Sequence, residues 1–230
     1  MNPPSLPSLR IQAYEGFRRC VFEGRIRPGQ FISQRELMQM LGMPLGAVRE
    51  MIPRLEAAQL IRTVPKRGLH LAQVDLNLIR NAFQVRGMIE REGIAHFIRS
   101  VTDAELDEIE AAHRALLQRA EAGEHGPAFL EEATAVDFAL HDRMVDSIGN
   151  EIMSEIYRVN SMHVRMMALE GSAAGRMVPA MHEHLAFIGA MRSRDSQAAI
   201  AAMLHHVHSS RKRVIDGSSG SPPVGHGLAA

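Results

Sequence analysis

The stretch from Arg35 to Gln59 decides the fold and reads RELMQMLGMPLGAVREMIPRLEAAQ. Its apolar residues recur at helical spacing in two runs, one before and one after Gly42. This periodicity predicts two amphipathic helices, and the glycine predicts the turn that joins them. The inward-facing residues are Leu37, Met40 and Leu41 in the first helix and Val48, Ile52 and Leu55 in the second, with Arg49 facing outward. The pattern is typical of a helix-turn-helix.

Two short apolar runs with a basic turn between them follow this motif. Leu60 and Ile61 form the first run, and Leu69–His70–Leu71 forms the second. The turn is Pro65–Lys66–Arg67–Gly68, which combines turn-forming residues with two positive charges. A helix-turn-helix followed by strand, turn and strand predicts a winged helix.

Charge is divided unevenly along the chain, although its formal net charge is zero. Residues 1–74 contain 11 Lys/Arg and 5 Asp/Glu, whereas residues 75–230 contain 15 and 21. Neutralisation of phosphates by Lys and Arg is a large, sequence-independent part of DNA affinity. A basic winged helix on an acidic remainder therefore indicates a double-stranded DNA partner.

The composition bounds the remaining chain. A length of 230 residues with 46% hydrophobic content allows two modest domains, and the weak strand signal after residue 74 favours helices. The single cysteine, Cys20, is expected to be a packing residue on a helix. Without a signal peptide or an apolar run long enough to span a bilayer, we expect a cytoplasmic protein with no membrane partner.

We expect a mainly α protein with a winged helix-turn-helix over 9–74, an all-α six-helix bundle over 75–216 and a disordered tail over 217–230. Helical periodicity places the bundle helices at about 76–100, 103–122, 127–148, 150–169, 178–193 and 196–215. Thr102 and Glu105 form a capping box at the start of the second of these helices. Residues 1–8, rich in Pro and Ser, are expected to be disordered.

Eleven of the 12 histidines follow residue 74, and they suggest a metal site in the bundle. Asp137 and His141 are four residues apart, so both can lie on one face of a helix. His184 and His206 lie on two helices joined by a short turn, which predicts an antiparallel pair with both imidazoles at one level. One carboxylate and three imidazoles suit zinc, nickel, iron or manganese.

Other arrangements of these residues are open. An Asp and a His four residues apart are most often part of a solvated helix face. His182, His205 and His208 compete for ligand roles, although helical geometry turns His182 and His205 away from the neighbouring ligands. His163 can also face the pocket. The residues expected at the surface or in the tail are His96, His113, His125 and His226.

The chain resembles a known family. Residues 11–72 are similar to the N-terminal domain of GntR-family transcriptional regulators. The matching motifs are Ile26–Arg27–Pro28–Gly29, Arg35–Glu36–Leu37, Val48–Arg49–Glu50, Arg54–Leu55–Glu56, Leu60–Ile61 and Arg67–Gly68. The C-terminal part resembles the helical FCD domain of the FadR subfamily, in its shorter VanR-like branch. There the matching residues are Val85–Arg86, Ile89–Glu90, Asp137 to His141, Gly149–Asn150, Glu183–His184 and Ala202 to His206.

The resemblance implies roles for individual residues. Arg35 and Arg49 match positions that contact operator DNA, and Lys66, Arg67 and Gly68 match the wing. The residues that match the family's metal positions are Asp137, His141, His184 and His206. One departure is clear, because Pro44–Leu45–Gly46–Ala47 stands where many members open the recognition helix with Ser-Arg-Thr-Pro. Contacts at this point cannot be carried over.

These features predict a homodimeric, metabolite-responsive transcriptional repressor. Four protein ligands leave two positions open on an octahedral ion, which hard oxygen donors can fill. We therefore expect a small organic acid as effector, with Arg86 as its main cation and Asn160 and Arg165 as further contacts. The alternatives are a metal-dependent enzyme using His163 or Arg86, and a metal sensor in which the ion is the effector.

Overall fold

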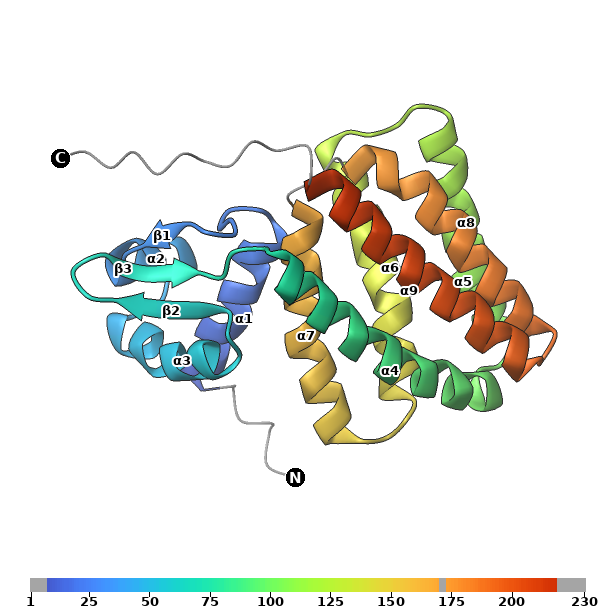
Figure 1. The fold of residues 1–230 in the computed structure, drawn as a ribbon, viewed down its shortest axis with the longest axis horizontal. Coiled ribbons are helices and arrows are strands. Elements are labelled where there is room, and N and C mark those ends of the chain that lie inside the picture. Colours follow the sequence, from blue (N-terminus) through green and yellow to red (C-terminus); the bar gives the residue numbers. More distant parts are fainter. Residues whose placement is uncertain (1–7, 170–172, 219–230) are drawn as a thin grey trace, which may run out of the picture.

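The computed structural model describes residues 8–169 and 173–218. The N-terminal part is a winged helix-turn-helix, as the sequence predicts (Figure 1). Its elements are α1 (Leu9–Phe22), β1 (Phe31–Ile32), α2 (Gln34–Leu41), α3 (Leu45–Ala57), β2 (Ile61–Val64) and β3 (Gly68–Leu71). The strands form an antiparallel sheet in the order β1-β3-β2.

Local chemistry sets the limits of the helix-turn-helix. Ser33 and Glu36 form a reciprocal capping box at the start of α2. Gly42 ends that helix at a φ of 61°, a left-handed conformation that costs glycine little. Phe17, Leu37 and Leu55 are fully buried in the apolar core that α1 forms with α2 and α3. The core thus fixes the angle between α2 and α3.

Strand β1 is an element that the sequence pattern did not predict. It has only two residues, too few for an alternating pattern to be visible, and its pairing of Ile32 with Leu69 depends on the tertiary fold. Its backbone passes so close to Gly68 that a Cβ there would lie 2.8 Å from the carbonyl oxygen of Ile32. With a φ of 92°, this position requires glycine.

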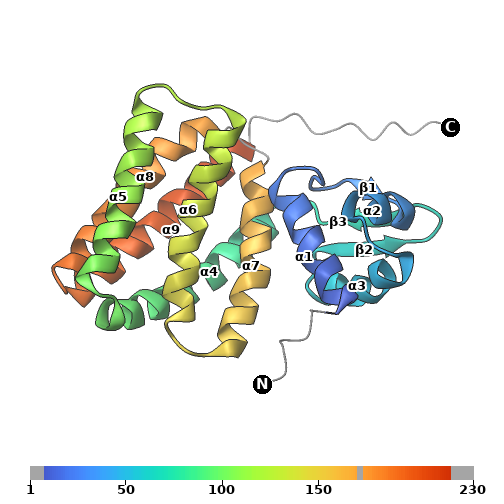
Figure 2. The ribbon, with the colours of Figure 1, turned by 180° about the vertical axis from the view of Figure 1, so that it is seen from behind.

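In its described residues, the C-terminal part consists of helices joined by short loops (Figure 2). Its six helices are α4 (Leu76–Ser100), α5 (Asp103–Glu121), α6 (Pro127–Asp146), α7 (Glu151–Leu169), α8 (Ala173–Arg192) and α9 (Ser196–Ser218). The predicted capping box of Thr102 and Glu105 is present at the start of α5. No helix of the described ranges is long and apolar enough to cross a membrane.

Two helix limits differ from the sequence-based expectation. Helix α8 begins at Ala173 rather than near residue 178 and so contains Pro179. Tertiary packing outweighs local propensity here, because Met177 and Met181 are buried in an apolar cluster with Phe129. Helix α9 includes the first two residues of the expected tail, and 219–230 lie outside the described residues.

Helix α7 joins the two parts of the molecule. It packs against α4 and α6 on one side and against α1 on the other (Figure 2). Met162 and Met166 belong to the same apolar core as the winged-helix residues. Glu155 pairs with Arg54 of α3 at 2.6 Å. Any movement of α7 therefore acts directly on the winged helix.

Candidate metal centre and DNA-binding face

Three histidines from three helices meet in the interior of the helical domain. His141 lies on α6, His184 on α8 and His206 on α9, and each is at most 2% exposed. The Nε2 atom of His184 is 3.3 Å from that of His141 and 3.4 Å from that of His206. Asp137 adds a carboxylate oxygen 3.1 Å from the same His184 nitrogen. The structure thus brings together all four predicted ligands.

In two of these rings, the Nδ1 nitrogen lies near a carboxylate. The Nδ1 atom of His206 is 2.9 Å from Oε2 of Glu183, and Nδ1 of His141 is 3.2 Å from Oε1 of Glu90. An acceptor at Nδ1 favours the tautomer that carries its proton there, which leaves the lone pair on Nε2. In His206 the Nε2 lone pair therefore faces the centre of the cluster. In His141 the guanidinium of Arg86, which can only donate, lies 2.9 Å from Nε2 and makes that nitrogen an acceptor as well.

In the third ring, that of His184, the Nδ1 nitrogen lies near His113. Its Nδ1 atom is 2.7 Å from the carbonyl oxygen of Ile109, which assigns the proton to Nδ1, and its Nε2 is 3.2 Å from Nδ1 of His184. His184 can therefore donate to His113 and keep its own Nε2 lone pair free. The expectation that His113 is a surface residue is wrong, since it is 1% exposed. Its spacing from the buried Ile109 and Leu116 on α5 could have revealed this.

Burial favours the neutral form of two of the ligand imidazoles, those of His184 and His206. Loss of solvent, together with the neighbouring histidines, holds the pKa of His184 well below its usual range. Burial lowers the pKa of His206 to about 4, against the opposing effect of Glu183. Although burial acts to raise the pKa of Glu183, Arg213 and His206 lower it to about 2. At neutral pH this set of donors fits a divalent metal ion.

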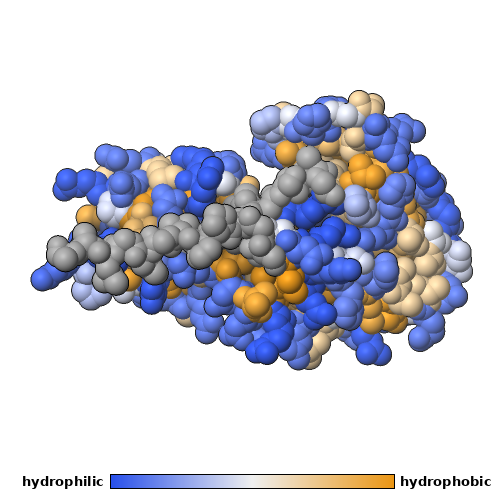
Figure 3. Space-filling model, turned by 45° about the horizontal axis from the view of Figure 1, so that its top comes forward, coloured by the Kyte–Doolittle hydropathy of each residue, from blue (hydrophilic) through white to orange (hydrophobic). Residues whose placement is uncertain are grey.

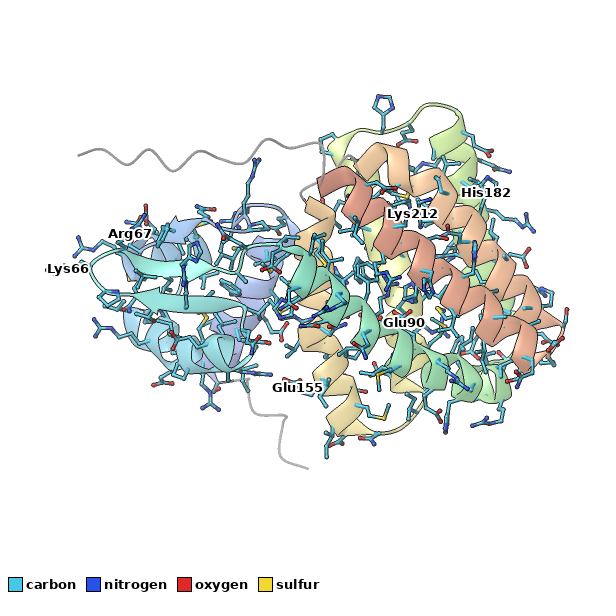
Figure 4. The ribbon with its side chains drawn as sticks, in the orientation of Figure 1. Lys66, Arg67, Glu90, Glu155, His182 and Lys212 are labelled. Carbon is cyan, nitrogen blue, oxygen red and sulfur yellow. The ribbon has the colours of Figure 1, made fainter. Side chains whose placement is uncertain are left out.

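Arg86 points into the same cluster from α4. Its Nη2 atom lies 2.9 Å from Nε2 of His141 and 3.2 Å from Nε2 of His206. Its Nε atom donates to Glu90 at 2.7 Å, and the hydroxyl of Tyr157 donates to the same carboxylate oxygen at 2.5 Å. Figure 4 shows Glu90 on α4 in the interior of the domain. Arg86 thus makes the local pair with Glu90 and also faces the ligands.

The two further effector candidates, Asn160 and Arg165, make contacts that join helices. Asn160 donates to the carbonyl oxygen of Ala82 at 3.0 Å, which joins α7 to α4. The guanidinium of Arg165 lies between the rings of Phe22 and Phe138, at 3.9 and 3.6 Å. Phe22 belongs to α1, so Arg165 is part of the junction with the winged helix. Burial lowers its pKa to about 10.

The competing histidines are not part of the cluster. His182, His205 and His208 are exposed, and His182 approaches Glu121 at the surface (Figure 4). His163 points toward the winged helix, where its Nε2 is 3.0 Å from the carbonyl oxygen of Ala58. His226 lies outside the described residues.

The predicted DNA-binding residues lie on the surface of the winged helix. Arg35, Arg49, Lys66 and Arg67 are all exposed. Lys66 and Arg67 occupy the tip of the β2–β3 turn, at the end of the molecule remote from the helical domain (Figure 4). Arg49 donates from Nε to Oε1 of Gln34 at 3.1 Å, a contact that sequence analysis missed. Arg67 stacks on the ring of Phe31 at 4.0 Å.

Comparisons with known proteins agree with this architecture. Residues 9–71 match the family model of bacterial regulatory proteins of the gntR family, and residues 81–209 match the FCD domain. The Nta operon transcriptional regulator of Aminobacter aminovorans is 24% identical over 190 residues, which cover 83% of this chain and 87% of that protein. The transcriptional repressor RspR of Escherichia coli is 22% identical over 210 residues, covering 89% of this chain and 87% of that one.

A solved structure has the same fold over almost the whole chain. McbR/YncC of E. coli superposes with a TM-score of 0.76 at 17% identity and covers 92% of this chain and 99% of its own. The relatives are named as transcriptional regulators, so the metal-dependent enzyme considered from the sequence is set aside. The chain belongs to the GntR family of bacterial transcriptional regulators, in the group that carries an FCD domain.

Proposed function

We propose that this regulator is a homodimeric repressor whose operator affinity is set by a small organic acid bound at a metal centre. The observation that supports this proposal most is the convergence of three imidazole Nε2 atoms and a carboxylate oxygen of Asp137 beside the buried cation of Arg86. That relatives include a named repressor favours repression over activation. A cytoplasmic location follows from the proposed function on DNA.

The winged helix would read the operator through α3 and the wing. Arg35 and Arg49 are placed to donate to base edges or phosphates in the major groove, and Lys66, Arg67 and Gly68 to approach the minor groove. Gly46, in the first turn of α3, has no atom within 4 Å of the position of a Cβ. This chain lacks the side chains of the usual Ser-Arg-Thr-Pro run. The start of α3 therefore has open space at Gly46.

A homodimer would double the number of base pairs that one winged helix reads. Three large apolar side chains are exposed on neighbouring helices: Met88 on α4 at 68%, and Ile152 and Ile156 on α7 at 74% and 50%. On the face shown in Figure 3, hydrophobic patches lie among hydrophilic side chains. We propose that this α4–α7 strip contacts the second copy. Sedimentation of wild type and Ile152→Asp tests this, and an unchanged dimer in the variant would exclude the strip.

Asp137, His141, His184 and His206 would hold one divalent ion. Metal analysis of protein prepared without chelator is the test, with His184→Ala beside His182→Ala as a matched control on the same helix. We expect about one ion per chain in wild type and in His182→Ala, and its loss in His184→Ala. Equal metal content in all three proteins would remove His184 from the site.

The charges around the centre favour an anionic effector. Arg86 pairs with Glu90 and Arg213 with Glu183, and Asp137 beside His184 adds a third carboxylate, so these groups carry one negative charge together. A divalent ion would leave one positive charge in a buried site, which a carboxylate can neutralise. A thermal-shift screen of sugar acids and dicarboxylates against neutral sugars and amines tests this class. A response confined to uncharged compounds would contradict it.

The metal ion itself remains a second candidate effector, because its four proposed ligands form a complete set without an organic molecule. Titrating zinc against operator binding in the absence of metabolite separates the two. If zinc alone changes operator affinity as far as zinc with an organic acid does, the protein is a metal sensor.

A further inference from the structure

The guanidinium of Arg86 occupies the coordinating atoms of the candidate metal centre. Its Nη2 atom is within hydrogen-bond distance of Nε2 of both His141 and His206, at 2.9 and 3.2 Å. A guanidinium can only donate, so both nitrogens are acceptors in these contacts, and the Nδ1 contact of His206 with Glu183 favours the same tautomer. A nitrogen has one lone pair in the ring plane, so it cannot accept from Arg86 and bind a metal ion at the same time.

We infer that Arg86 is an internal cation that exchanges with the divalent ion. In one state its guanidinium holds the two imidazoles, and in the other the metal holds them and Arg86 is displaced. This inference rests on the proposed metal centre and adds to it a regulatory step. Arg86 is fully enclosed between Glu90 and the histidines, so the exchange is confined to the interior of the bundle.

The displaced guanidinium explains how metal and effector can cooperate. Two cations this close repel each other strongly in a buried site. A carboxylate that accepts from Arg86 and also reaches the metal ion relieves that repulsion, since guanidinium binds carboxylate in a two-pronged geometry. The effector would therefore stabilise the metal-bound state and the metal would prepare the effector's partner, as reciprocal linkage requires.

The exchange is connected to the winged helix through α7. Glu90, the ion-pair partner of Arg86, accepts from the hydroxyl of Tyr157 on α7. On the same helix, Glu155, two residues before Tyr157, pairs with Arg54, and His163, six residues after it, contacts the carbonyl of Ala58. When the guanidinium turns away from the histidines, its hydrogen bond from Nε to Glu90 shifts with it, and the Tyr157 contact to the same carboxylate oxygen adjusts. Displacement of Arg86 therefore affects α7, the helix that packs against the winged helix.

Zinc affinity of the full-length protein tests the exchange. Calorimetric titration with Zn²⁺ alone compares wild type, Arg86→Met and Arg91→Met, an exposed arginine on the same helix that serves as the control. Removing the competing cation should tighten Zn²⁺ binding at least about tenfold, while Arg91→Met binds like wild type. Because Arg86→Met leaves Glu90 buried without a counter-charge, Arg86→Met/Glu90→Gln is titrated as well.

A spectroscopic readout follows the displacement itself. The chain has no tryptophan and two tyrosines, so in a Tyr14→Phe background Tyr157 is the only fluorophore of its kind. Zinc has a filled d shell and leaves the emission unquenched by unpaired electrons. We expect Zn²⁺ to change Tyr157 emission in this background, and to leave it unchanged when His184→Ala is added.

The outcomes distinguish a failure of the Arg86 exchange from a failure of the proposed metal centre. Failure of Zn²⁺ to bind any of the proteins would overturn the metal centre and the exchange with it. Binding that requires His184 but is equally tight in wild type, Arg86→Met and the double variant would overturn the exchange alone. So would a Tyr157 emission that stays constant while calorimetry shows Zn²⁺ saturating the Tyr14→Phe protein.

Discussion

The winged helix and the helical domain have interiors of opposite character. In the winged helix, fully buried side chains such as Phe17, Leu37 and Leu55 are apolar, and the arginines lie outside. The helical domain buries Arg86 and Glu90 together with three histidines beside Phe187. Burying charge costs stability even when it is paired, whereas apolar burial contributes to it. The apolar interior of the winged helix stabilises the fold that carries the exposed arginines. The polar interior of the helical domain is suited to binding a ligand.

The largest expected effect comes from breaking the buried ion pair. Glu90→Gln keeps the shape of the side chain but leaves Arg86 charged and without its counter-ion, so we expect the free energy of unfolding to fall by about 3–5 kcal/mol. Arg86→Met/Glu90→Gln should recover much of this loss. Urea denaturation at neutral pH measures both. If the effects of the two substitutions simply add, Arg86 and Glu90 are not coupled, and the interior of the helical domain does not depend on this ion pair.

Acid should destabilise the helical domain through the same cluster. The pKa of His206 is about 4 in the folded protein against 6.5 for the ordinary side chain, so between these values the unfolded chain binds more protons. Stability is therefore lost as the pH falls from about 6.5 towards 4, by about 3 kcal/mol for this residue at most. His184 is shifted in the same direction.

The pH effect is measured by urea denaturation at pH 7 and pH 4.5. His206→Asn should show a smaller loss than wild type, and His208→Asn, an exposed neighbour, should behave like wild type. Glu183 stays ionised across this interval, because its pKa is about 2, and does not obscure the result. A wild-type loss unaffected by His206→Asn would place the sensitive group elsewhere.

On the winged helix, substitutions should affect binding and leave stability almost unchanged. Arg49→Ala is expected to lose about 1–3 kcal/mol of operator binding, the range for one bidentate base contact, with preference relaxed at the base it reads. Lys66→Ala should weaken binding to all sequences alike. Gel-shift titrations on the best operator and on unrelated duplexes check this. Arg49→Ala equal to wild type on the operator would rule out the assignment of α3.

The smallest effect is expected at the junction of the two parts. Arg54 and Glu155 are 43% and 47% exposed, so their ion pair should contribute less than about 1 kcal/mol to stability. Glu155→Gln is therefore expected to fold normally. Its informative measurement is the change in operator affinity caused by zinc and organic acid together. A reduced response at unchanged stability would show that α7 carries the coupling, and a full response would assign it to other contacts.

The sequence by itself determined the elements whose signals are local. Helical periodicity, Gly42 and the basic turn at Lys66 and Arg67 identify the winged helix, and the capping box at Thr102 marks the start of α5. The spacing of Asp137 and His141 put both on one helix face, as the structure shows. These features depend on residues within a few positions of one another, where backbone geometry alone sets the outcome.

Only the tertiary structure decided which faces meet. The roles of His113 and Arg86 at the cluster depend on α4, α5, α6, α8 and α9 converging on one point, and no spacing within a helix specifies its neighbour. The same reason explains why the contacts of Asn160 with Ala82 and of Arg165 with Phe138 were not predicted, since helical spacing does not specify a partner on another helix. Packing of side chains distant in sequence sets the register between helices, and that register turned a set of separate polar residues into one buried site.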